Sequence, residues 1–132
     1  MILLDTNVLI HFIKGKPTVV ERVNAAPSHD LAISSVTRYE LEYGVLQMGA
    51  ARRKIVHELC AGLQQIPFDE AAALEAAKIR ADLSAKGRLI GPLDLLIAGT
   101  ARSRGAVLVT GNTREFARVK GLRCEDWTAV EK

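Results

Sequence analysis

Short apolar runs alternate along this chain with longer segments in which apolar residues recur at helical spacing. Residues 1–6, 31–33 and 107–109 predict strands buried on both faces, and 66–68 and 122–124 predict shorter extended segments. Helical spacing is found over 7–14, 17–26, 36–48, 51–63, 70–85 and 92–104, with a further helical turn at 113–118. This alternation indicates one α/β domain over residues 1–132. Its mainly parallel sheet of four to five short strands would be flanked by helices on both faces.

Several residues mark where the predicted helices begin and end. Ser35 and Asp69 are suitable N-caps for the helices 36–48 and 70–85. Pro92 occupies the favoured first position of the helix 92–104, and Gly105 ends that helix. These signals agree with the spacing of the apolar residues, so the same elements are predicted twice over.

The composition narrows the possible function classes. The net charge of +3 and the pI near 9.1 permit a nucleic-acid partner without requiring one. Aromatic residues make up 5% of the chain, which supplies few rings for stacking on bases. Cys60 and Cys124 are expected to be reduced thiols, and their surroundings do not suggest zinc. Asp5 interrupts the N-terminal apolar run, so we expect no signal peptide, no membrane segment and a cytoplasmic location.

Asp5 directly follows the first apolar run and would lie at the carboxyl edge of the sheet. Parallel α/β sheets bind their ligands outside this edge. Aspartate is also a favoured N-cap, so capping the helix 7–14 is an alternative role for Asp5. The chemical interpretation therefore depends on whether other acids reach the same edge.

Glu40 lies one turn into the helix that follows the second strand, from where its carboxylate can reach back over the sheet edge. Gly44 is on the same helix face and would allow a neighbouring element to approach Glu40 closely. Glu42 is rotated by about 200° from Glu40, so both acids cannot face one site. Exposure to solvent is the alternative for both residues.

Asp94 is the third residue of the helix that begins at Pro92. A carboxylate in the first turn stabilises a helix through its dipole, which is one sufficient reason for its presence. Asp94 also shares a helix face with Ile97, Ala98 and Ala101, and this face is predicted to be buried. Because aspartate is rarely buried without a partner, Asp94 is a candidate site residue.

Carboxylates that converge within a few ångströms repel one another unless one is protonated or a cation lies between them. Mg²⁺ takes oxygen ligands, and it is usually held by one or two carboxylates, water and substrate phosphate. Such an ion can activate water against a phosphodiester. The chain has no GxxxxGK[ST] phosphate loop, and His11, His29 and His57 are scattered. A phosphotransfer receiver with Asp5 as acceptor would need adjoining acids and a late lysine.

Several short motifs together resemble the PIN domain. These are Leu3 to Asn7 (LLDTN), Ile33 to Thr37 (ISSVT) followed by Glu40 to Gly44 (ELEYG), Gly91 to Asp94 (GPLD) and Val109 to Phe116 (VTGNTREF). Their order and spacing over almost the whole chain are most similar to VapC toxins of bacterial type II toxin–antitoxin modules. The fold class expected from the resemblance is therefore α/β and PIN domain-like.

The resemblance implies an endoribonuclease that depends on Mg²⁺ or Mn²⁺. VapC toxins typically cut structured RNA, often tRNA, and thereby stop translation. A VapB antitoxin inserts its C-terminal segment at or near the acidic site. The resemblance also implies a homodimer, and contact with operator DNA only through the toxin–antitoxin complex.

Matched to the family motifs, Asp5, Glu40 and Asp94 correspond to the first three catalytic acids. The resemblance implies that Asp5 and Asp94 ligate the metal, and that Glu40 ligates it or orients a metal-bound water. The position of a common fourth acid is occupied by Asn112. Glu115 could substitute for that acid or serve as a surface or salt-bridging residue. Hydroxyl and amide groups near the metal waters would come from three further residues, Thr6, Asn7 and Thr113, for which capping or turn formation is the alternative.

On the substrate side, Lys86 and Arg88 are the preferred candidates for RNA contacts, because their loop directly precedes the Asp94 helix. An exposed position without substrate contact is the alternative for each. A second function class is a catalytically silent module that binds RNA or the antitoxin without cutting. Its support is the missing fourth acid, and cleavage of tRNA that EDTA abolishes would separate the two classes.

Overall fold

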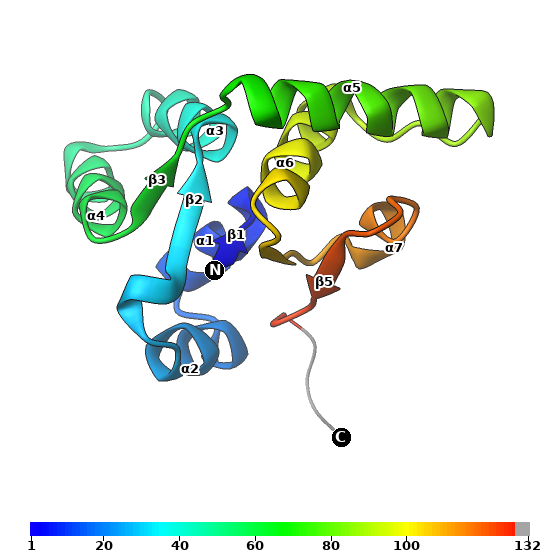
Figure 1. Ribbon diagram of the computed structural model, residues 1–132. Helices are drawn as coiled ribbons and strands as arrows, with labels where there is room; N and C mark the ends of the chain where they lie inside the picture. Colours follow the sequence, from blue (N-terminus) through cyan, green and yellow to red (C-terminus); the bar gives the residue numbers. More distant parts are fainter. Residues whose placement is uncertain (129–132) are drawn as a thin grey trace.

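A computed structural model describes residues 1–128 and forms five parallel strands and seven α-helices in that range (Figure 1). The strands are β1 (Ile2–Leu4), β2 (Leu31–Ser34), β3 (Gln64–Ile66), β4 (Val107–Val109) and β5 (Arg123–Glu125). The helices are α1 (Thr6–Ile13), α2 (Pro17–Ala25), α3 (Ser35–Val45), α4 (Ala50–Ala61), α5 (Glu70–Ala85), α6 (Pro92–Ser103) and α7 (Thr113–Phe116). A single turn of 3-10 helix, Ser28–Asp30, precedes β2.

The sheet has the strand order β3-β2-β1-β4-β5, and every pairing is parallel. The first strand is therefore the central one, with β2 and β4 on either side. This confirms the predicted parallel sheet. It also places the loops after β1, β2 and β4 next to one another at the carboxyl edge.

Helices cover both faces of the sheet, because successive residues of each short strand point to opposite sides. Leu3 and Leu108 pack with residues of α5, α6 and α7 in one core cluster. Leu4 and Val109 pack with residues of α1, α2, α3 and α4 in the other. The predicted layers are confirmed.

Some predicted element boundaries were wrong by a few residues. The first strand covers Ile2–Leu4 and not residues 1–6, and α3 ends at Val45 and not at residue 48. The N-cap of α3 is Ser34 and not Ser35, because the Ser34 hydroxyl accepts the Thr37 N–H at 3.0 Å. The third strand covers Gln64–Ile66 and not residues 66–68. Pro67 has no N–H to donate to a ladder, whereas Gln64–Ile66 pair in register with Ala32–Ser34.

Helices α5 and α6 approach each other very closely at Gly99. A Cβ placed on Gly99 would lie 2.6 Å from the Ala76 Cβ and 2.8 Å from the Ala72 carbonyl oxygen. Only a glycine allows this approach, which fixes α6 and hence Asp94 at its first turn. Among the described residues, no helix is both long and apolar enough to cross a membrane.

Candidate active site

Asp5 and Thr110 lie side by side where the two central strands end. Leu4 is in register with Val109, so the next residues of both strands emerge at the same edge. The Thr110 hydroxyl donates to Asp5 Oδ2 at 2.8 Å, and the Thr6 N–H donates to Asp5 Oδ1 at 2.8 Å. Asp5 therefore caps α1, which was the alternative role predicted from the sequence. It also presents a buried carboxylate at the sheet edge.

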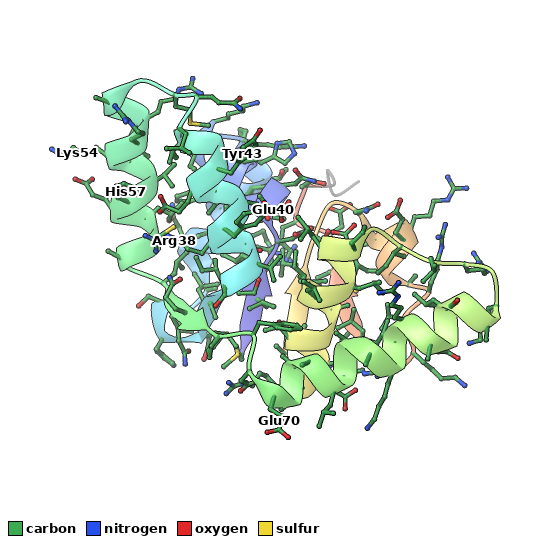
Figure 2. The ribbon with its side chains drawn as sticks, turned by 90° about the horizontal axis from the view of Figure 1, so that it is seen from above. Arg38, Glu40, Tyr43, Lys54, His57 and Glu70 are labelled. Carbon is green, nitrogen blue, oxygen red and sulfur yellow. The ribbon has the colours of Figure 1, made fainter. Side chains whose placement is uncertain are left out.

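The position of Glu40 is fixed by the same turn. The Thr6 hydroxyl donates to Glu40 Oε1 at 2.8 Å and also lies 3.3 Å from the Thr37 hydroxyl. Thr6 therefore links the Asp5 turn to α3 by its main chain on one side and its side chain on the other. Figure 2 shows Glu40 on the side of α3 that faces α6, and Arg38 on the opposite side.

Asp94 is half-buried at the start of α6, and the other acids act on its charge. Burial, with further contributions from the negative charges of Asp5, Glu115 and Glu40, raises its pKa to about 6. The three predicted catalytic acids come from three separate elements, and their charges act on one another at this edge of the sheet. Their joint role in a site stays a prediction.

Burial also raises the pKa of Asp5, while the hydrogen bonds from Thr110 and Thr6 oppose this effect. Both hydrogen bonds favour the ionised form, because a carboxylate is the stronger acceptor. Burial is the larger effect, so the pKa of Asp5 stays above its ordinary value despite these two hydrogen bonds. The buried hydroxyl of Thr110 also accepts the Asn112 N–H at 3.0 Å, so its own proton remains available for Asp5.

Glu115 contributes to the site, although the sequence favoured a surface or salt-bridging role for it. Within residues 1–128 it forms no ion pair, and Asn112 Nδ2 donates to its Oε2 at 3.1 Å. Its charge contributes to the raised pKa of Asp94. The site therefore has four carboxylates, with Asn112 orienting the fourth.

The remaining sequence candidates contribute less to the geometry. The side chains of Asn7 and Thr113 form no hydrogen bond within the described range, and Asn7 is exposed. Lys86 is exposed and paired with Asp82 at 3.0 Å, which reduces its availability for phosphate. Arg88 is exposed. No neighbouring element approaches Gly44, contrary to the expectation from sequence.

Thr110 is the site residue that the sequence reasoning missed. The signal was available, because Thr110 follows the strand 107–109 just as Asp5 follows the first strand. The rule that drew attention to Asp5 therefore applies equally to the neighbouring strand. A hydroxyl there was overlooked because only acids were traced along the sheet edge.

Oxygen donors without a nearby cation suit a divalent hard metal. Across the described residues, no lysine or arginine forms an ion pair with any of the four carboxylates. In the same range, no three or more His, Cys, Asp or Glu side chains are gathered closely enough to hold an ion among themselves. Asp5 and Asp94 are nevertheless the type of oxygen ligand that Mg²⁺ takes, since it is usually held by one or two carboxylates with water in its other positions.

The family model described as "PIN domain" matches residues 2–122. The chain belongs to the PIN domain family. Within it, the chain is a member of the VapC ribonucleases, because the "tRNA(fMet)-specific endonuclease VapC" of Shigella flexneri is 46% identical over 129 residues. That alignment covers 96% of this chain and 97% of the relative. The Salmonella typhimurium protein of the same name is 44% identical and is covered to 96%.

Solved structures of PIN domain proteins superpose closely on this chain. The structure of DNA-bound VapBC from Salmonella typhimurium matches with a TM-score of 0.88 at 44% identity, covering 96% of this chain and 97% of that one. VapBC2 from Rickettsia felis, bound to a promoter DNA fragment, matches with a TM-score of 0.88 at 32% identity. It covers 96% of this chain and 99% of that one.

Proposed function

We propose that this chain is a metal-dependent endoribonuclease toxin that cuts tRNA and is neutralised by a VapB-type antitoxin. The carrying observation is the convergence of four carboxylates in a chain that aligns almost end to end with a tRNA(fMet)-specific endonuclease. The name of that relative makes initiator tRNA the first substrate to test. Halting of translation would follow from loss of this tRNA.

Asp5 and Asp94 are the proposed ligands of Mg²⁺ or Mn²⁺. When bound, such an ion supplies a nucleophile from water and stabilises charge on the phosphodiester. The Thr110 hydroxyl and the Thr6 N–H fix the direction of the Asp5 carboxylate and favour its ionised form against the effect of burial. Glu40, held by the Thr6 hydroxyl, is placed to accept a proton from water at the edge of the site. Asn112 orients Glu115 toward the same region.

The Asp5→Asn variant in Mg²⁺ tests this assignment on purified tRNA. Asparagine is also a good N-cap, so α1 is expected to remain folded. We expect cleavage to fall by at least about a hundredfold, as for the loss of a main electrostatic group in an active site. EDTA should abolish cleavage by the wild type. A folded Asp5→Asn protein with full activity would refute the assignment.

Sequencing of RNA 5′ ends after induction of the protein identifies the target. New ends confined to one tRNA would support the proposed substrate class. Intact tRNA, with RNA binding retained, would favour the catalytically silent module instead. The missing fourth acid supports that alternative less now, because Glu115 brings a carboxylate to the site.

An antitoxin partner is supported by the VapBC complexes among the structural relatives. A small, mostly apolar pocket that Glu40 helps to line would receive a single apolar side chain of the antitoxin. Its lining comes from α1, α3 and α4 and from the residues around them: Ile10, Ile13, Lys14, Leu41, Gly44, Val45, Met48, Arg52 and Val56. Contact with operator DNA is assigned to the antitoxin complex, as in the two DNA-bound relatives.

A homodimer is the proposed assembly of the toxin. An apolar groove lies between α5 and α6 and includes Phe68, Leu89, Leu95 and Leu96. Leu74 and Leu89 are large apolar residues exposed in this half of the molecule. Analytical ultracentrifugation of the wild type and of Leu89→Asp would test whether this region joins two copies.

A further inference from the structure

Both tyrosines of the chain lie on the solvent side of α3 and flank the acidic site. Tyr39 and Tyr43 are each 61% exposed. They are four residues apart and so lie next to each other along one side of the helix. Glu40 directly follows Tyr39 and lies three residues before Tyr43. The sequence is poor in aromatic residues, yet the fold exposes two rings together beside a catalytic candidate.

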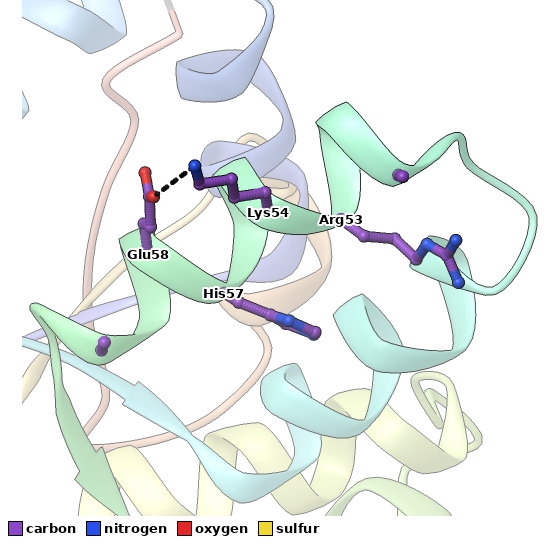
Figure 3. A pocket seen from close by; sticks show the side chains of 6 residues that line it. Arg53, Lys54, His57 and Glu58 are labelled. Atoms are coloured by element: carbon purple, nitrogen blue, oxygen red, sulfur yellow. Dashed lines mark ion pairs between the residues drawn. The ribbon is translucent and has the colours of Figure 1, made fainter.

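The surface around these rings has an excess of positive charge. Of the four cations on α3 and α4, Arg38 pairs with Glu42 and Lys54 pairs with Glu58, whereas Arg52 and Arg53 form no ion pair among the described residues. Figure 3 shows Arg53 and His57 extending from the same side of α4 toward α3. Glu42 binds Arg38 at 2.8 Å and lies 3.3 Å from His57 Nε2, which joins the two helices.

We propose that Tyr39 and Tyr43 form a stacking surface for unpaired bases of the RNA substrate, with Arg53 contacting the adjacent phosphates. The proposal rests on the function proposed above and identifies where that substrate would lie. Stacking on aromatic rings tolerates any base, because every base has a π-face. Unpaired loop bases are the part of a structured RNA that can leave its own stack and reach a protein surface.

Charge favours RNA over a second copy of the chain as the occupant. A two-fold interface brings the same patch of both subunits together. Here, that contact would place the cations of α3 and α4 against their own copies. A polyanion has the complementary charge, and its release of counterions adds to affinity.

The test compares side chains that differ in aromaticity but keep much of the apolar area. Variants Tyr39→Phe/Tyr43→Phe and Tyr39→Leu/Tyr43→Leu would bind a fluorescein-labelled RNA stem-loop in EDTA, where cleavage is expected to stop. We expect the leucine variant to lose affinity by about fivefold to a hundredfold, from the stacking contribution of one or two bases. The phenylalanine variant should retain wild-type affinity. Asn24→Ala, an exposed and uncharged change on α2, is the control and should bind as the wild type does.

A second readout follows the stacked base directly. A 2-aminopurine in the loop should be quenched by the wild type and by the phenylalanine variant, but not by the leucine variant. Equal quenching and equal affinity for all three proteins would overturn the proposal. So would a change in molecular mass for the leucine variant without loss of RNA affinity, because the rings would then belong to a contact between proteins.

The two proposals fail in different ways. If the wild type cuts tRNA while the leucine variant binds and cuts equally well, only the stacking surface is wrong. If the wild type binds the stem-loop through the tyrosines but cuts no RNA with any divalent metal, the nuclease proposal fails and the stacking surface stands.

Discussion

The two ends of α6 differ in how they affect stability. Its second half is packed so closely on α5 that Gly99 leaves no room for a Cβ. Its first turn holds Asp94 half-buried, and burial together with the charges of three other acids raises its pKa to about 6. The contact at Gly99 is favourable packing, whereas the cluster at Asp94 costs folding free energy in the absence of a cation. A rigid helix lets the favourable end hold the unfavourable one in place.

Removing the charge of Asp94 in the first turn of α6 should have the largest effect on activity. We expect Asp94→Asn to reduce RNA cleavage by at least about a hundredfold, because a proposed metal ligand is lost. Single-turnover cleavage of tRNA with saturating Mg²⁺ measures this effect. Glu70→Gln, which removes an exposed carboxylate at the start of α5, is the control and should cut normally. Equal rates for wild type and Asp94→Asn would remove Asp94 from the site.

Disturbing the contact between Gly99 and α5 should mainly affect the stability of the fold. Gly99→Ala places a methyl group within 2.6 Å of the Ala76 Cβ, so α5 and α6 must separate. Overpacking of this kind destabilises a fold by about 1–3 kcal/mol, which urea unfolding can measure. Gly44→Ala is the matched control in α3, where a Cβ meets nothing within 4 Å. It should stabilise the fold by about 0.5–1 kcal/mol, since alanine is the better helix former.

A change at Thr110 probes the link between the strands and the acids. Thr110→Val keeps the shape of the side chain but removes the hydrogen bond to Asp5. We expect a loss of about 1–3 kcal/mol in stability, because the lost bond is to a charged group. The pKa of Asp5 should rise, so the acidic limb of the pH–rate profile should move to higher pH. Thr110→Ser should restore that limb, whereas a hydroxyl needed only for packing would leave the profile unchanged in both variants.

The stability of the metal-free protein should depend on pH through the Asp94 carboxyl, and this effect should be smaller than those above. The pKa of Asp94 is raised from 3.8 to about 6, so the folded state binds a proton that the unfolded state has released. This contribution to stability is present below pH 3.8 and is lost as the pH rises through about 6. When the pH is raised from 4 to 7 in EDTA, the unfolding temperature of the wild type should therefore fall by more than that of Asp94→Asn. Parallel curves for the two proteins would contradict the raised pKa.

The sequence predicted more of the site than of the packing that holds it. Asp5, Glu40 and Asp94 could be placed because each stands at a recognisable element boundary, and strand order in parallel sheets brings such boundaries together. Asp94 was also expected on a buried face because it shares that face with Ile97. These inferences depend on local periodicity, which can be recognised in a single sequence.

Other features depended on tertiary contacts that no local pattern reveals. The contribution of Glu115 follows from how α7 is held, with the neighbouring Phe116 fully buried in the core. The need for glycine at position 99 arises from the approach of α5 and could not be read from α6 alone. Likewise, the sequence predicted Ser35 as the cap of α3, whereas the fold uses the adjacent Ser34.

The most direct test of the account is an NMR titration of the Asp94 carboxyl carbon with and without Mg²⁺. In EDTA, we expect a midpoint near pH 6, because burial and three carboxylates raise the pKa of Asp94 to about 6. Saturating Mg²⁺ should bring the midpoint below the ordinary value of 3.8, because the ion favours the carboxylate. A midpoint close to 3.8 in EDTA that does not respond to Mg²⁺ would contradict the convergence of the acids on a shared metal.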